Sequence, residues 1–326
     1  MTAVLLTTGL VVLGLALILL GQHQPDRLLR LAFTLLRWQA RLRRGVLVAA
    51  GHRWVHAWCP ARDPAAPMLV MLHGFTGSKE NWYPLARALG RRFHLCIPDL
   101  PGWGESERKP DAAYGYVEQA ERVAAYLRAV SPDRPVVLLG HSMGGGIAAL
   151  VAARFPAQVA QVALISAAGV RFDDNAFGLA VLAGHNPFAV CDAASLRRYL
   201  ATVFYDPAAK PWIPWPVATA LIARRRADAA FEQVVLDRIG RGPDSLRPGE
   251  EAARITQPAL LVWGRQDAVI DPSALSLYAA RIPHARTLLL EGCGHMVPME
   301  RPQALAEAVL DWIGQNRDGG LHAAQA

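Results

Sequence analysis

The pentapeptide Gly140-His141-Ser142-Met143-Gly144 carries the strongest chemical signal in the sequence. It follows the apolar run 136–139 and precedes an uncharged, alanine-rich stretch, so we expect it to turn directly from a strand into a helix. Such a turn lifts a serine hydroxyl above a sheet, and the glycines on both sides let the backbone turn tightly. This context predicts that Ser142 is a nucleophile.

A serine hydroxyl becomes a good nucleophile only when a base removes its proton. Asp267 follows the predicted strand 259–263, and His295 lies in a glycine-rich loop after the predicted strand 287–290. The chain order Ser, Asp, His and the shared edge of the sheet predict that His295 is the base and that Asp267 orients it. Two alternatives remain open. Asp271 could take the place of Asp267, or the predicted partners could be purely structural, with Asp267 as a helix cap and His295 as a loop histidine.

Acyl transfer also requires hydrogen-bond donors for the oxyanion that forms in the transition state. His73-Gly74-Phe75 follows the predicted strand 68–72, where the second donor loop of such a site belongs. We therefore expect the backbone N–H groups of Phe75 and Met143 to form the oxyanion hole, and His73 to brace its loop.

The elements that must position these residues alternate between short apolar runs and helical stretches from about residue 45 onward. This alternation predicts an α/β fold with a mostly parallel sheet flanked by helices. The predicted strands are 45–50, 54–58, 68–72, 93–97, 136–139, 162–166, 259–263 and 287–290. The predicted helices of this region are 81–89, 116–129, 143–154, 273–281 and 302–315.

The alternation stops between residues 170 and 256, where no strand is apparent. We expect this segment to be a helical cap inserted into a core formed by residues 45–169 and 257–316. Its predicted helices are 193–204, 216–225 and 228–239, and the prolines and tryptophans of 211–216 predict a rigid apolar elbow. Residues 317–326 are predicted to be a flexible tail.

Residues 1–22 are predicted to be a transmembrane anchor. No charged residue occurs from Thr2 to Gly21, and twenty helical residues extend roughly 30 Å, the thickness of the hydrocarbon core of a bilayer. A cleaved signal peptide is disfavoured because no Lys or Arg precedes the apolar run. A buried core helix is disfavoured because the run has no polar face.

Residues 23–44 are predicted to be a basic amphipathic juxtamembrane helix, with a plain helical linker as the alternative. Residues 1–54 hold seven arginines and one aspartate, whereas the other 272 residues hold 27 basic and 26 acidic groups. The positive-inside rule therefore places the rest of the chain on the cytoplasmic side of a membrane, and of the inner membrane in a bacterium. A nucleic-acid function loses its support because six of the seven net positive charges of the chain lie in this short segment.

The composition excludes further classes. With 52% hydrophobic and 19% charged residues, the chain is neither disordered nor of low complexity. The four cysteines are scattered and form no metal-binding or disulfide pattern. No phosphate-binding, dinucleotide-binding or zinc-protease motif is present, so we expect neither a cofactor nor a metal.

These motifs together resemble those of α/β-hydrolase-fold serine hydrolases. The resemblance covers about residues 45–312 and is greatest to membrane-anchored monoacylglycerol lipases and related bacterial lipases. It is carried by HGFTGSKENW, DLPGWGES, GHSMGG, WGRQDAVID and EGCGHMVPMERP, at 73–82, 99–106, 140–145, 263–271 and 291–302. It implies Ser142 as nucleophile, Asp267 and His295 as its partners, and Phe75 and Met143 as oxyanion donors.

The expected function is therefore that of an esterase or lipase. We expect a lipid or ester substrate, either a monoacylglycerol or a short- to medium-chain acyl ester, and contact with an anionic membrane surface. Two alternatives remain: a carbon–carbon bond hydrolase of aromatic ring-cleavage products, and a non-catalytic lipid-binding protein of the same fold.

Overall fold

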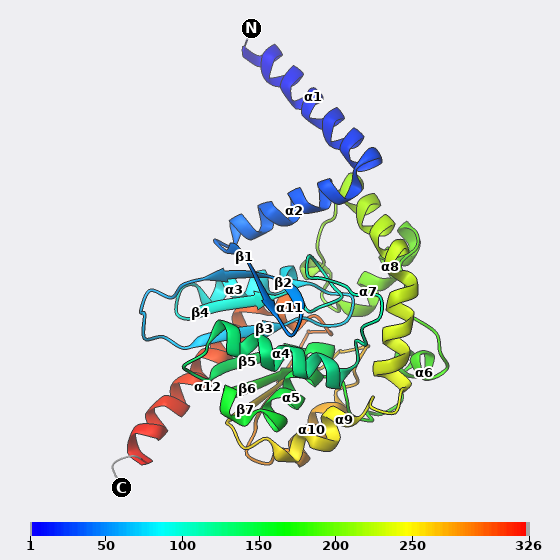
Figure 1. Cartoon of the computed structure of the whole chain (residues 1–326). Helices are drawn as coiled ribbons and strands as arrows, with labels where there is room; N and C mark the ends of the chain where they lie inside the picture. Colours follow the sequence, from blue (N-terminus) through cyan, green and yellow to red (C-terminus); the bar gives the residue numbers. More distant parts are fainter. Residues whose placement is uncertain (1, 324–326) are drawn as a thin grey trace.

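The structure, a computed structural model, describes residues 2–323 of the chain. Within this range, the side chains of residues 2–6, 9–11, 13 and 316–323 lie outside the description. Helix α1 (Thr2–His23) projects away from the rest of the molecule, and α2 (Pro25–Gln39) turns back across it (Figure 1).

The centre of the fold is an eight-stranded sheet in the order β1-β2-β4-β3-β5-β6-β7-β8. β2 is antiparallel to both β1 and β4, and the other pairs are parallel. Parallel strands covered on both faces are apolar along their whole length, and every residue of β5 and β7 is buried. The strands are β1 (Arg43–Ala49), β2 (His52–Cys59), β3 (Met68–Leu72), β4 (His94–Pro98), β5 (Val136–His141), β6 (Val159–Ile165), β7 (Ala259–Gly264) and β8 (Arg286–Leu290).

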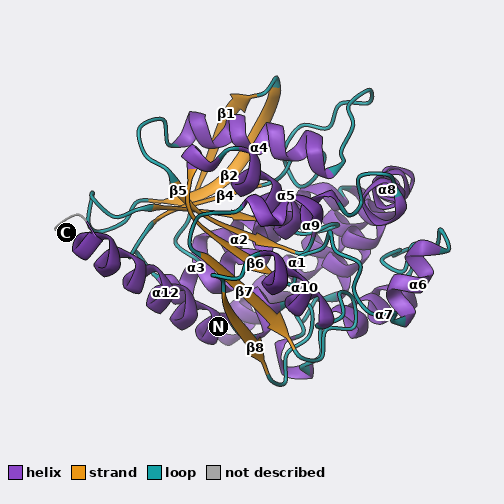
Figure 2. Ribbon diagram, turned by 90° about the horizontal axis from the view of Figure 1, so that it is seen from below, coloured by secondary structure: helices purple, strands orange, loops and turns teal. Residues whose placement is uncertain are grey.

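Helices cover both faces of this sheet (Figure 2). One face packs against α4 (Tyr116–Val130), α5 (Met143–Arg154) and α10 (Ser273–Arg281), which form one buried apolar cluster with it. The other face packs against α3 (Tyr83–Leu89) and α12 (Pro302–Ala323) in a second cluster. The predicted α/β architecture with a mostly parallel sheet is confirmed.

A set of helices between β6 and β7 lies over the carboxyl edge of the sheet. It consists of α6 (Ala176–Leu182), α7 (Ala193–Val203), α8 (Trp215–Arg241) and α9 (Arg247–Glu251). The two helices predicted at 216–225 and 228–239 are one continuous helix, since the two residues between them, Arg226 and Ala227, both favour helix. Helix α6 was not predicted from the sequence; it is only seven residues long and begins at an Asn175 cap.

Two predictions concern the chain ends. The segment 1–22 is helical as part of α1, but within the described part of the chain no helix is long and apolar enough to cross a membrane. At the other end, α12 extends to Ala323, well beyond the predicted limit at residue 315. Of the predicted tail 317–326, residues 324–326 lie outside the described residues.

Candidate active site

Ser142 occupies a strained turn between β5 and α5. Its backbone has φ 56° and ψ −121°, a region that non-glycine residues rarely adopt. The turn is tight, because a Cβ atom at Gly140 would lie 2.2 Å from the Gly144 carbonyl oxygen, and one at Gly144 would lie 2.4 Å from that of Leu72. Both glycines are therefore required by close backbone contacts, as the sequence pattern predicts.

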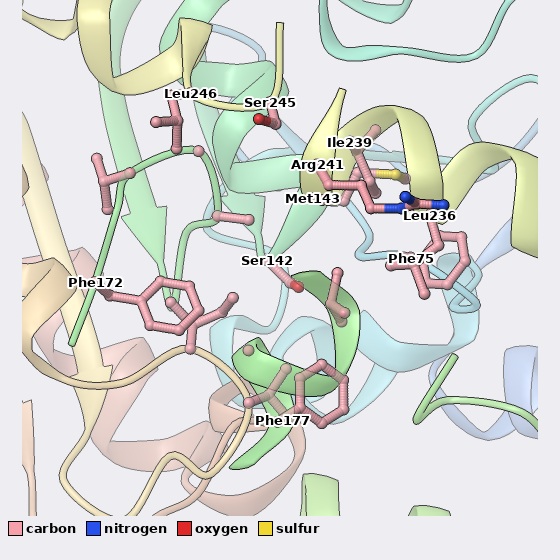
Figure 3. Close-up of a pocket in the computed structure, with 18 of the residues that line it drawn as sticks. Phe75, Ser142, Met143, Phe172, Phe177, Leu236, Ile239, Arg241, Ser245 and Leu246 are labelled. Atoms are coloured by element: carbon pink, nitrogen blue, oxygen red, sulfur yellow. The ribbon is translucent and has the colours of Figure 1, made fainter. Parts of the chain in front are cut away.

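The Ser142 hydroxyl faces an apolar cavity of about 240 Å³. In Figure 3 the serine lies between Phe75 on one side and Phe172 on the other, with α8 residues Leu236 and Ile239 nearby. Ser142 as a whole residue is only 6% exposed. A buried hydroxyl at the wall of an apolar cavity is suited to a substrate with a hydrocarbon chain.

Asp267 and His295 lie in contact at the same edge of the sheet, in the loops that follow β7 and β8. The His295 Nδ1 atom is 2.8 Å from the Asp267 Oδ2 atom, so Nδ1 donates to the carboxylate and Nε2 remains free to accept a proton. The other oxygen of Asp267 accepts from the backbone N–H groups of Val269 and Ile270, at 2.9 and 3.0 Å. These bonds hold the carboxylate in one orientation toward the imidazole.

Asp271, the alternative carboxylate, has a different role. Its Oδ1 atom accepts from the Ser273 N–H at 2.9 Å, at the start of α10, and it makes no contact with His295 among the described hydrogen bonds. The geometry therefore favours Asp267 over Asp271 as the partner of His295.

Ser142 and His295 lie on neighbouring loops. The ring centroid of His141, the residue before Ser142, is 4.8 Å from the ring centroid of His295. In the described part of the chain the Ser142 hydroxyl makes no hydrogen bond. Such a bond is often long without substrate and shortens when substrate binds.

The loop after β3 passes directly beside the nucleophile. A Cβ atom at Gly74 would lie 2.9 Å from the Ser142 Cβ atom, and Phe75 lines the same cavity. Met143 begins α5, where the first amides have no partner within the helix. Phe75 and Met143 therefore both lie beside Ser142 at the wall of the cavity.

His73 braces this loop through both ring nitrogens. Its Nδ1 donates to the Gly74 carbonyl at 2.8 Å, and its Nε2 accepts from the Leu100 N–H at 2.9 Å. Burial lowers the pKa of His73, which keeps the ring neutral and both bonds intact.

His141 has a role that its sequence context does not reveal. Its Nε2 donates to the His295 carbonyl oxygen at 2.8 Å and so joins the turn at Ser142 to the histidine loop. Burial, together with the neighbouring His295, lowers the pKa of His141 to about 3, so the ring is neutral at physiological pH. Its place beside Ser142 was visible in the sequence, but its partner is a backbone atom 154 residues away.

The role of Glu300 was not predicted either, because its partners are also backbone groups. One carboxylate oxygen accepts from the N–H groups of Gly294 and Met296, on either side of His295. The other accepts from the N–H groups of Tyr205 and Asp206, just beyond α7. Glu300 thus fixes the histidine loop against the segment between α7 and α8.

A buried ionic cluster supports the loop after β3. Lys79 is 1% exposed, and its ammonium group lies 2.7 Å from Asp99 and 3.0 Å from both Glu80 and Glu105. Burial opposes its charge, but the three carboxylates outweigh this and raise the pKa of Lys79. Asp99 also accepts from the backbone N–H groups of Lys79 and Glu105, so it joins the loops after β3 and β4.

Residues 69–308 match the alpha/beta hydrolase family, so the chain belongs to this family. Among its relatives, Lipase 1 of Psychrobacter immobilis is 31% identical over 78% of each chain. The mouse monoacylglycerol lipase ABHD6 is 26% identical over 89% of this chain and 88% of its own length.

The solved structure of a bacterial membrane phospholipase A superposes with a TM-score of 0.83 and 31% identity. The alignment covers 97% of this chain and 99% of that one. Together with the lipase relatives, the family match shows a hydrolase of the lipase and esterase type.

Proposed function

We propose that the chain is a serine carboxylic-ester hydrolase that acts through a covalent acyl-enzyme. The observation that carries the proposal is the arrangement at the carboxyl edge of the sheet. There a strained serine faces an apolar cavity, and the adjacent loops bring His295 into a 2.8 Å bond with Asp267.

The proposed reaction begins when His295 Nε2 takes the proton of the Ser142 hydroxyl and the Oγ atom attacks the acyl carbonyl carbon. The N–H groups of Phe75 and Met143 stabilise the resulting oxyanion. His295 then returns the proton to the departing alcohol. A water molecule, activated by His295, attacks the acyl-enzyme and releases the acid. Asp267 holds the Nδ1–H tautomer and stabilises the imidazolium without taking its proton.

The proposed substrates are monoacylglycerols or short- to medium-chain acyl esters. The walls of the cavity near Ser142 are largely aliphatic and aromatic, which suits a single acyl chain. The relatives named monoacylglycerol lipase and lipase support this substrate class.

We also propose that residues 1–39 attach the protein to a membrane, with the hydrolase region on the cytoplasmic side. Leu31, Leu35 and Trp38 are exposed on α2 at spacings of four and three residues, which places them on one face of the helix. The arginines of α2 can meet anionic head groups beside this face. The likeness to a membrane phospholipase supports attachment.

The test compares the wild type with Ser142→Ala on p-nitrophenyl esters of increasing chain length and on monoacylglycerols. We expect turnover by the wild type and a loss of at least about 10⁴-fold in the variant. A dienone acid of the ring-cleavage type, assayed in parallel, tests carbon–carbon hydrolysis. Folded wild type that hydrolyses no ester would contradict the proposal.

A further inference from the structure

The segment before α8 exposes two tryptophans. Trp212 is 86% exposed and Trp215 is 57% exposed, within the sequence Lys210-Pro211-Trp212-Ile213-Pro214-Trp215-Pro216. We call residues 210–216 the cap elbow. Its three prolines restrict the backbone, so little ordering entropy would be lost if these rings met a partner. Tryptophan is enriched where an apolar medium meets water, notably at membrane interfaces.

The start of α8, which includes the end of the cap elbow, lies beside the junction between α1 and α2 (Figure 1). A Cβ atom at Gly21 would lie 3.2 Å from the Pro216 Cβ atom. Just beyond the elbow, Ala220 of α8 packs in a buried apolar cluster with Leu28 and Leu29 of α2. The elbow is therefore adjacent to the segment that we propose attaches to a membrane.

The charge of this region favours anionic lipid. The chain contains no acidic residue from 27 to 62, which includes the exposed face of α2, and none from 207 to 227, which includes the cap elbow. Arginines occupy positions 27, 30 and 37 of α2, and Lys210 begins the elbow. Basic residues beside exposed aromatic and aliphatic side chains are typical of surfaces that bind anionic bilayers.

We propose that the cap elbow is a second membrane contact, in which Trp212 and Trp215 enter the head-group region of an anionic bilayer beside α2. The proposal rests on the membrane attachment proposed above and extends it to the cap. Its consequence follows from α8, whose first turn leaves the elbow and whose residues Leu236 and Ile239 line the cavity at Ser142. Lipid contact at the elbow would therefore act on the first turn of the same helix whose later residues line the cavity at Ser142.

An environment-sensitive fluorophore at residue 212 tests this contact. The full-length chain carries Trp212→Cys together with Cys191→Ser, because Cys191 is exposed whereas the other three cysteines are buried. The labelled protein is reconstituted in phosphatidylcholine–phosphatidylglycerol vesicles, with and without brominated lipid. The matched control carries the label at Val234→Cys, which is 68% exposed on α8, roughly 28 Å along the helix axis from Trp215 at its start.

We expect a blue shift and quenching by brominated lipid at residue 212, with neither at residue 234. Replacing phosphatidylglycerol by phosphatidylcholine should reduce the effect. An unquenched label at 212 in protein that floats with the vesicles would overturn the proposal, as would equal quenching at both positions. Protein that does not bind the vesicles would overturn it too.

A second variant measures the functional consequence. In the double variant Trp212→Ser and Trp215→Ser, we expect a several-fold higher KM for acylglycerol in vesicles and an unchanged kcat/KM for a soluble short-chain ester. An unchanged KM for vesicles would count against a functional contact. Hydrolysis of the soluble ester by the wild type separates the two proposals: if it is absent while residue 212 is quenched, the hydrolase proposal fails and the membrane contact stands.

Discussion

The loops at the carboxyl edge of the sheet and the surface formed by α2 and the cap elbow differ in how deeply their side chains are buried. Ser142, Asp267 and His295 are each at most 6% exposed, and hydrogen bonds to backbone groups fix the loops around them. Trp212 and Trp38, by contrast, are 86% and 76% exposed. The comparison teaches that the residues of the proposed catalytic site are buried and held in place, whereas the residues of the proposed membrane contact are exposed.

The largest expected effect is that of Asp267→Asn on the rigid edge. The amide oxygen keeps the bonds from the Val269 and Ile270 N–H groups, so the NH₂ group faces His295 Nδ1 and donates to it. His295 then favours the wrong tautomer, and we expect kcat to fall by about 10⁴-fold. The matched control, Asp271→Asn, removes a charge but keeps an oxygen that can accept from the Ser273 N–H, and it should leave kcat within a few-fold of the wild type. Steady-state hydrolysis of a p-nitrophenyl ester measures both. Equal losses in the two variants would contradict the assignment of Asp267.

The second expected effect is on stability. Lys79→Met leaves the buried carboxylate of Asp99 without its cation, and we expect the free energy of unfolding at pH 7 to fall by about 3–5 kcal/mol. Arg44→Met is the control, since its pair with Glu105 is at the surface and should contribute about 0–1 kcal/mol. Urea unfolding measures the free energy of unfolding of both variants. Similar small decreases in the two would show that the buried cluster around Lys79 does not stabilise the fold.

The pH dependence of this loss has a defined sign. Although burial opposes ionisation of Asp99, Lys79 lowers its pKa, so in the wild type its contribution is present above the ordinary range of an aspartate and is lost as pH falls through the lowered value. In Lys79→Met that contribution is missing. The difference in stability between wild type and variant should therefore be retained from pH 7 down to about pH 4, the ordinary range of an aspartate, and should narrow at lower pH. A difference that stays constant below about pH 4 would contradict this account.

The third effect concerns the cavity. Leu236→Trp narrows the space beside Ser142, and we expect kcat/KM for the longest esters to fall by about 10–200-fold while the shortest esters are affected much less. Val234→Trp, two residues earlier on α8 and exposed to solvent, should leave the chain-length profile unchanged. A uniform loss for all chain lengths would indicate damage to the fold rather than to the acyl site.

The smallest effect is expected at His141. His141→Ala removes the donor to the His295 carbonyl, a bond whose loss costs about 1–1.5 kcal/mol, or about tenfold in kcat. His141→Gln keeps a side-chain N–H and should recover part of the loss. The readout is kcat against KM, and a change in KM alone would argue against positioning of His295.

Sequence patterns predicted most strands of the sheet and the turn at Ser142, but fewer of the contacts that hold the neighbouring loops. The strands and the glycines around Ser142 were predictable because burial and close backbone contacts restrict the residue types. The roles of His141 and Glu300 were not, because their partners are backbone groups of loops that only the tertiary fold brings near. The prediction of two helices in place of α8 was wrong, because the residues near position 227 favour helix and no helix-breaking residue separates the two predicted segments.

The most direct test of the proposed chemistry is covalent labelling with an alkyl fluorophosphonate. The Ser142 Oγ atom would attack phosphorus, the P–F bond would break, fluoride would leave, and His295 would take the serine proton. The account predicts one adduct, on the peptide that contains Ser142, absent from Ser142→Ala and from urea-unfolded wild type. An adduct on another residue, or none in folded protein that hydrolyses esters, would contradict it.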